Sequence, residues 1–353
     1  MKKRNVFLVL CAALLTAALA GCAEPAPEDI EDFGEKTKVS KAFTVSNTDE
    51  WAAAVKAIDG GGNDRNYVVN VTGPVDIPGL EGSTFSQPHS GVNISLRGTG
   101  PDAALVLSGK GSLIALGEGE HLVLRDITLK GSEDNAAPLV YAGGGSTLTM
   151  KAGAEVSGNG NGADVESALG GGVHVAAGAV FTMQGGEISG NTSGSGGGVS
   201  VGGADDDGGG ERGTFIMRGG TISGNEVFYG NHGQFGEGGG VFVTAGAVFT
   251  MEGGEISGNT SYEIGGGVCV WESDFTMEGG EISGNIADYG GGVYVRDGTF
   301  SLTGGIVHGS DGGDKANEAG QGASLYRYSG SAVYGDGSPI ARGRAVNETL
   351  TGR

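Results

Sequence analysis

Cysteine and proline are scarce in this chain, which has 3 cysteines and 8 prolines among 353 residues. We expect Cys11 to be removed with an N-terminal segment, and Cys22 to be modified at the cleavage point. Cys269 would then be the one thiol left, so no intramolecular disulfide between cysteines can form in the mature chain. Its stability must therefore come from packing.

Basic and aromatic residues are also few. The chain has 21 lysines and arginines against 42 aspartates and glutamates, a formal net charge of −21, and 7% aromatic residues. A surface with this charge repels phosphates, so the composition argues against nucleic acid as a partner. It favours a soluble surface protein and leaves open one that collects divalent cations.

Long apolar runs are absent except near the N-terminus, where Val6–Ala20 follows the basic residues of Met1–Arg4. This run is short for a transmembrane helix and is typical of a signal peptide. Its end, Leu19-Ala20-Gly21-Cys22, resembles the lipobox of bacterial lipoprotein precursors. The resemblance implies cleavage before Cys22 and a diacylglycerol on its sulfur, so a membrane would be a partner through this lipid anchor. An ordinary secretory signal with a chance cysteine is the alternative.

The residue after the lipobox bears on localisation. In the lipoproteins that this segment resembles, an Asp directly after the lipidated Cys favours retention in the inner membrane. Ala23 stands at that position. We therefore expect an exported protein that is lipid-anchored to the cell envelope, at the outer membrane or the cell surface.

Composition and pattern divide the chain into five segments. Residues 1–21 are the signal peptide, 22–41 an acidic tether, 42–62 an N-terminal capping segment, 63–335 a repeat region and 336–353 a C-terminal tail. The tether contains Pro25 and Pro27 and shows no apolar period, so we expect it to stay solvated and extended.

The capping segment contains one helical pattern, Asn47–Ile58. Asn47 is a suitable N-cap, and Glu50 follows at the spacing of a capping box. Apolar side chains then recur at i, i+4 and i+7, at Trp51, Val55 and Ile58. The pattern predicts a short helix that covers the open end of a repeat structure, where strand edges and apolar side chains would otherwise be exposed.

Glycine is abundant, with 75 residues, but it is periodic rather than scattered as in a flexible linker. One phrase, Phe-Thr-Met-Glu-Gly-Gly-Glu-Ile-Ser-Gly-Asn, occurs at Phe249–Asn259 and Phe275–Asn285. Looser copies lie at Phe181–Asn191, Phe215–Asn225, Leu148–Asn159 and, frayed, Phe300–Ser310. A second phrase, Gly-Gly-Gly-Val-x-Val, alternates with the first and starts at Gly170, Gly196, Gly238, Gly265 and Gly290.

The two phrases together define units of about 25 to 27 residues, with insertions between some of them. Each unit contains three short strand patterns separated by sharp turns, for example Val241–Val243, Phe249–Met251 and Glu255–Ser257. Three such strands fit one triangular turn of a parallel β-helix better than a series of hairpins. We therefore expect an all-β solenoid, with a short capping helix at its N-terminal end.

The stretch Leu148–Ser310 resembles the right-handed parallel β-helix surface proteins of bacteria in the pectin-lyase-like superfamily. Its two phrases are also similar in style to the Gly-Gly-Ala-Ile and Phe-x-x-Asn repeats of chlamydial polymorphic membrane proteins, with Val in place of Ile. The resemblance implies a right-handed parallel β-helix. It specifies the fold far better than the activity.

Alternation with period two assigns the side chains that face the core. The phrases predict one column each of Phe, Met and Ile and two of Val, with Phe181, Phe215, Phe249, Phe275 and Phe300 forming the first. The Met column is expected to be core packing rather than a metal or redox site. The phrase-ending asparagines predict a ladder of stacked side-chain amides at Asn159, Asn191, Asn225, Asn259 and Asn285.

Outward-facing aromatic residues are the first candidate site. Phe242 and Tyr294 occupy the variable position of Gly-Gly-Gly-Val-x-Val, and Trp271 lies at the end of one copy. Aromatic side chains exposed in a row on a rigid sheet would form a platform for a glycan or a protein ligand. Packing under loops is the alternative for many of the outward aromatics.

Outward-facing glutamates are the second candidate site. The repeat stacks Glu252 on Glu278 and Glu255 on Glu281, and it places Arg218 beside Glu252. Three interpretations stay open: a solvated acidic face, weak Ca²⁺ bridging through carboxylate oxygens, and a glycosidase carboxylate pair. Apart from this Ca²⁺ hypothesis, no cofactor is expected.

The expected function is binding rather than catalysis, and no catalytic residue is predicted. We expect a lipid-anchored envelope protein that presents a surface for adhesion to glycans or to host or envelope proteins. A polysaccharide lyase or glycoside hydrolase of the β-helix class is the first alternative. A purely structural spacer at the cell surface is the second.

Overall fold

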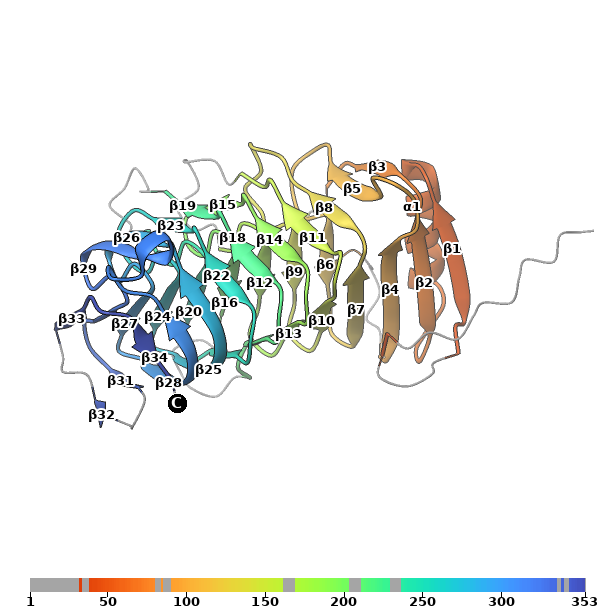
Figure 1. Ribbon diagram of the computed structural model, residues 1–353. Coiled ribbons are helices and arrows are strands. Elements are labelled where there is room, and N and C mark those ends of the chain that lie inside the picture. Colours follow the sequence, from red (N-terminus) through yellow and green to blue (C-terminus); the bar gives the residue numbers. More distant parts are fainter. Residues whose placement is uncertain are drawn as a thin grey trace, which may run out of the picture.

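The computed structural model describes residues 32–33, 38–79, 84, 90–160, 169–202, 211–228, 236–334, 338–339 and 343–352. These residues form an elongated stack of parallel strands with an α-helix at one end (Figure 1). The expected fold class, an all-β parallel β-helix, is confirmed.

The Phe-Thr-Met phrases lie on the longest face of the helix, where each strand pairs in parallel with its equivalent in the next turn. Phe215, for example, stands opposite Phe181 on one side and Phe249 on the other. The strands of this face are, in order, β1 (Lys41–Val45), β2 (Asn66–Val71), β4 (Val92–Gly98), β7 (Glu120–Arg125), β10 (Thr147–Met150), β13 (Val180–Met183), β17 (Thr214–Met217), β21 (Val248–Met251), β25 (Asp274–Ser283), β28 (Thr299–Val307) and β31 (Ser331–Tyr334).

The Glu-Ile-Ser part of the phrase forms a second face beside the first. Its strands are β3 (Pro74–Ile77), β5 (Ala104–Leu107), β8 (Thr128–Lys130), β11 (Glu155–Ser157), β14 (Glu187–Ser189), β18 (Thr221–Ser223) and β22 (Glu255–Ser257). The long strands β25 and β28 run through both faces.

The Gly-Gly-Gly-Val-x-Val phrases form the third face, a nine-stranded sheet. It consists of β6 (Ile114–Leu116), β9 (Val140–Ala142), β12 (Val173–Val175), β16 (Val199–Val201), β20 (Val241–Thr244), β24 (Val268–Trp271), β27 (Val293–Arg296), β30 (Leu325–Arg327) and β33 (Arg344–Val346). A five-stranded sheet that the sequence did not predict follows the asparagines: β15 (Thr192–Ser193), β19 (Glu226–Val227), β23 (Thr260–Ser261), β26 (Ile286–Tyr289) and β29 (Glu318–Gln321).

The inward columns are confirmed, since the Phe, Met, Ile and Val side chains of the two phrases are fully buried in one core. The rings of Phe181, Phe215, Phe249 and Phe275 stack with centroids 4.5 to 4.8 Å apart. These spacings equal the distance between neighbouring strands, so each turn of the β-helix stacks one buried phenylalanine ring on the ring of the preceding turn.

The asparagine ladder is also confirmed and extends one step further at each end, to Asn135 and Asn317. In the middle of the ladder the side chain of Asn225 donates to Oδ1 of Asn259 at 3.0 Å. The side chain of Asn259 donates in turn to Oδ1 of Asn285 at 2.9 Å. Each of these asparagines is buried, and the ladder satisfies polar groups at a corner where the strands turn away from one another.

The invariant glycines of both phrases make room for this packing. Gly254 has φ +91°, and a Cβ there would lie 2.8 Å from the carbonyl oxygen of Gly220 in the preceding turn. A Cβ on Gly240 would lie 2.7 Å from the carbonyl oxygen of Gly267 and 3.0 Å from Nδ2 of Asn259. A side chain at either position would therefore push neighbouring turns apart.

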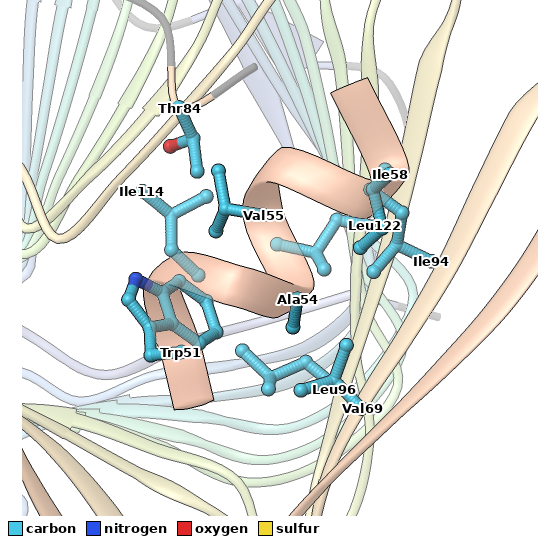
Figure 2. Close-up of a pocket in the computed structure, with 10 residues that line it drawn as sticks. All are labelled: Trp51, Ala54, Val55, Ile58, Val69, Thr84, Ile94, Leu96, Ile114 and Leu122. Atoms are coloured by element: carbon cyan, nitrogen blue, oxygen red, sulfur yellow. The ribbon is translucent and has the colours of Figure 1, made fainter. Parts of the chain in front are cut away.

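The N-terminal end is covered by α1 (Thr48–Asp59), close to the predicted helix. Asn47 caps it by accepting from the backbone N–H of Glu50 at 3.0 Å. Figure 2 shows Trp51, Ala54 and Ile58 lying over the apolar side chains of the first strands, where a cavity of only about 10 Å³ remains. Strand β1, which precedes α1 and pairs with β2, was not predicted.

The C-terminal end is covered by the tail. After the 3-10 turn Gly313–Lys315, β33 pairs antiparallel with β30, and β34 (Leu350–Thr351) pairs antiparallel with β28. A further short strand, β32 (Ser338–Pro339), pairs antiparallel with β31. Val346 and Leu350 are buried in the core, so the tail closes the last turn of the helix.

Candidate functional site

The predicted aromatic platform is not an exposed surface. Phe242 and Tyr294 point away from the main core, as their alternation predicts, but they retain only 4% and 6% of their exposure. They form a second apolar cluster with Ile264 and Cys269, against which Trp271 packs partly buried. The expectation of exposure was wrong, because residues of the adjoining corner cover this part of the nine-stranded sheet. Ligand binding by Phe242, Trp271 and Tyr294 stays a prediction, but the exposed aromatic surface on which it depended is not present at Phe242 and Tyr294.

Burial shifts the pKa values of two ionisable groups at this cluster, Cys269 and Glu237. Burial raises the pKa of the Cys269 thiol well above its ordinary value, which keeps it protonated and a poor nucleophile. Glu237 is also buried, and burial raises its pKa to about 7, although Ser195 Oγ donates to it at 3.3 Å. Arg296 lies over the ring of Trp271 at 4.0 Å from the centroid. The cluster is built for packing.

His174 and Ser200 face outward on the same sheet as register partners in β12 and β16. Burial lowers the pKa of His174 to about 4, so the imidazole is neutral, and it stacks on Tyr141 at 5.4 Å between centroids. Among the described residues, neither Nδ1 of His174 nor Oγ of Ser200 has a hydrogen-bond partner. A nucleophile activated by a base requires that bond, so the pair shows no sign of one.

The predicted glutamate columns are present, and two of their four carboxylates are engaged by cations. Arg218 Nε pairs with Glu252 at 3.0 Å, as predicted. Lys315 Nζ and His308 Nε2 contact Glu281 Oε1 at 2.7 and 2.8 Å. These hydrogen bonds lower the pKa of Glu281, and the bond from Lys315 has the larger effect.

Within the part of the chain that the structure describes, no group of three or more His, Cys, Asp or Glu is placed to hold a metal ion. The Ca²⁺ hypothesis for Glu252, Glu255, Glu278 and Glu281 stays untested.

A polar groove of about 480 Å³ lies on the outer surface of the first face, across β4, β7, β10 and β13. His121 is half-buried there, its Nδ1 lies 2.6 Å from Thr147 Oγ1, and burial lowers its pKa. The lining combines hydrogen-bonding side chains with a few apolar ones: Asp32, Phe33, Asn93, His121, Leu122, Val123, Thr147, Thr149, Lys151 and Gln184.

One edge of the groove follows a column of basic side chains. Arg97 and Arg125 are register partners, and Lys151 follows at the equivalent position after Met150 in β10. Arg97 Nε also donates to Asn70 Oδ1 at 2.7 Å. The same column continues through Gln184 and Arg218 and then becomes acidic at Glu252 and Glu278. A chain with a net charge of −21 thus places three basic side chains in one column beside this groove, and Lys151 also lines it.

Asp32, from the segment predicted to be a free tether, is docked on this column. Its Oδ1 contacts Lys151 Nζ at 3.1 Å and Arg125 Nη1 at 3.3 Å, and its Oδ2 accepts from Ser95 Oγ at 2.5 Å. Burial alone would raise the pKa of Asp32, but the Ser95 hydrogen bond and the two cations outweigh it and lower the pKa. Phe33 beside it packs against Val39 and Val68.

The prediction that 22–41 stays solvated is therefore wrong for Asp32 and Phe33, and β1 already begins at Lys41. The sequence shows the acidic segment and the scattered basic residues. It does not show that strand register brings the latter into one column. The signal peptide, Cys22 and the rest of the segment up to Glu31 lie outside the described residues.

Comparisons with known proteins identify no relative: no family model, no curated protein and no solved structure matches this chain. The resemblance to pectin-lyase-like proteins therefore rests on the repeat itself. No helix among the described residues is long and apolar enough to cross a membrane.

Proposed function

We propose that this protein is a lipid-anchored β-helix of the cell envelope that binds glycan chains without catalysis, through the groove across β4, β7, β10 and β13. The observation that carries the proposal is the groove itself, a polar depression of about 480 Å³ on an otherwise regular face. The lipid anchor at Cys22 and the location at the outer membrane or cell surface are part of the same proposal and rest on the lipobox-like sequence.

The lining of the groove supports a glycan as the ligand. Thr147, Thr149, Asn93 and Gln184 offer hydroxyl and amide groups that both donate and accept, as sugar hydroxyls require. Four neighbouring strands about 4.8 Å apart span roughly 14 Å, so the groove suits an extended chain rather than a single small molecule. Phe33 adds an aromatic face, which favours contact with the apolar side of a sugar ring.

Binding is tested on the mature chain with Cys22→Ser, using calorimetry with the tetramers of N-acetylglucosamine and of galacturonic acid. The double variant Thr149→Val/Gln184→Ala removes two groups of the lining and is expected to lower affinity at least about tenfold. Thr276→Val/Glu278→Ala changes the equivalent positions on β25, outside the groove, and should leave affinity unchanged.

Two results would contradict the proposal. If neither tetramer nor a wider glycan panel binds, the groove is not a glycan site, and the alternative of a purely structural spacer is favoured. If the incubated tetramers are shortened or acquire a double bond, the protein is an enzyme. Mass spectrometry of the membrane-extracted protein tests the anchor separately, with a diacylglycerol adduct on Cys22 as the expected result.

A further inference from the structure

We propose that Asp32 and Phe33 act as a latch that completes the groove, so that docking of this anchor-proximal segment and glycan binding reinforce each other. The coupling rests on the proposed function, because it needs a ligand in the groove. The docking half does not depend on it. Asp32 and Phe33 would then be part of the binding site rather than of a passive spacer.

The receptor for the latch is built from three successive strands. Ser95 on β4 and Arg125 on β7 each donate to a different carboxylate oxygen of Asp32. Lys151 after β10 donates both to Oδ1 and, at 3.3 Å, to the backbone carbonyl of Asp32. The Asp32 side chain keeps only 3% of its exposure, so the carboxylate is fully engaged by charge-assisted hydrogen bonds.

The latch and the groove share residues. Asp32 and Phe33 line the groove together with Lys151, so these two docked residues form part of its wall. If the segment leaves, the groove loses an aromatic ring and a carboxylate, and Lys151 loses the partner that fixes its position. A ligand that contacts this wall must bind the latched form more tightly, and by linkage it must stabilise docking by the same factor.

The charges around Asp32 keep the latch closed at neutral pH. Arg125 and Lys151 face it directly, and Arg125 also pairs through Nε with the exposed Asp126 at 3.3 Å. The pKa of Asp32 lies below its ordinary value of 3.8. Docking is therefore at full strength above about pH 4 and weakens only as the pH falls through the lowered pKa.

Ser95→Ala separates docking from the groove, because Ser95 is buried beneath Asp32 and does not line the groove. On the mature chain with Cys22→Ser, hydrogen exchange of the Phe33 amide should accelerate about tenfold, the effect of one hydrogen bond to a charged group. Affinity for the tetramer that binds in the previous assay should fall, by up to the same factor. Asp32→Ala should give larger changes of the same sign.

Ser301→Ala is the matched control, since Ser301 occupies the same outward column on β28, far from the latch. It should alter neither exchange at Phe33 nor affinity. In the wild-type chain, a saturating tetramer should slow exchange at Phe33. This last readout tests the coupling in the opposite direction.

Each other outcome overturns a different statement. Unchanged exchange in Ser95→Ala and Asp32→Ala means that Asp32 does not latch. Faster exchange with unchanged affinity means that the groove does not need the latch, and higher affinity means that Asp32 competes with the ligand. If no glycan binds the wild-type chain, the proposed function fails and the coupling with it, while the exchange data still decide whether the segment docks.

Discussion

At the scale of single residues, the asparagine ladder shows how one side chain can serve three neighbouring turns. Oδ1 of Asn259 accepts from both the backbone N–H and the side chain of Asn225, each at 3.0 Å. Its Nδ2 donates to Oδ1 of Asn285 and to the carbonyl of Ile222, each at 2.9 Å. No aliphatic residue can replace these bonds, since the groups that they satisfy are buried.

We predict that Asn259→Ala lowers the free energy of unfolding by about 3 kcal/mol, because buried donors and acceptors on two neighbouring turns lose their partner. Urea denaturation followed by circular dichroism measures the change. Thr250→Ala, an outward residue in β21 of the same turn, should cost less than about 0.5 kcal/mol. A loss below about 1 kcal/mol for Asn259→Ala would show that the ladder is not a main source of stability.

The buried carboxyl group of Glu237 predicts how the stability of the protein depends on pH. Its pKa is raised by burial from an ordinary value of 4.5 to about 7, so between these pH values the folded chain binds a proton that the unfolded chain releases. Stability from this group is therefore full below about pH 4.5 and is lost as the pH rises to 7. Glu237→Gln should be more stable than the wild type by about 3 kcal/mol at pH 8 and gain almost nothing at pH 4.5.

The comparison of Glu237→Gln with the wild type isolates this group from His174. The pKa of His174 is lowered to about 4, so its contribution grows as the pH rises from 4 to 6.5 and opposes that of Glu237 in the wild-type curve. Subtracting the two urea-denaturation curves cancels His174, which both proteins share. A stability difference that does not vary with pH would show that Glu237 is ionised in the folded chain.

Residue-level prediction from the sequence worked for the core and failed for the candidate site. Periodicity determines which side chains face inward, because the strands have period two and the core lies on one side. Exposure on the other side depends on what covers it. Phe242 packs with the corner residue Ile264, which lies between two phrases, after Asn259 and before Gly265, where neither phrase assigns a face. The basic column was missed for a related reason, since Arg97 and Arg125 belong to early, degenerate repeats whose register with Lys151 the sequence does not show.

At the scale of elements, the strands that carry one of the two repeated phrases were predicted almost to the residue. In the degenerate part the apolar pattern runs on from Leu122 to Leu129 without marking the corner between two strands. There β7 ends at Arg125 and β8 starts at Thr128, because Asp126 turns the chain with φ +51°. The two-residue strands after the asparagines are too short to carry an alternation, so no pattern could predict them.

The predicted helix succeeded because both of its signals are local. Asn47 caps the first turn, and Glu50 accepts from the backbone N–H of the preceding Ser46 at 2.7 Å. The apolar stripe of α1 then meets the core, as Figure 2 shows for Trp51. Strand β1 was missed because only its pairing with β2 defines it, and that pairing joins residues 26 positions apart, such as Lys41 and Tyr67.

At the scale of the whole molecule, the strands of each turn pair only with those of the turns before and after it, so the first and last turns each have one side without a neighbouring turn. A β-helix without caps exposes backbone donors and acceptors at both ends, which invites pairing with a second copy. Here α1 and β1 protect one end and β33 and β34 protect the other (Figure 1). Asp32 adds a further contact outside the two ends, because it binds Ser95, Arg125 and Lys151 on the side of the molecule.

We predict that truncation after Pro339 converts the protein into a self-associating, less stable form. The deletion removes β33 and β34 and leaves the edges of β30 and β28 unpaired. It also uncovers core residues that Val346 and Leu350 now bury. Sedimentation at several concentrations should show oligomers, and thermal unfolding should begin at a lower temperature.

Glu348→Ala, an exposed change between the two strands, is the control and should remain monomeric. If the truncated chain also remains monomeric with an unchanged melting temperature, the tail is dispensable, and the last complete turn must protect its own edge.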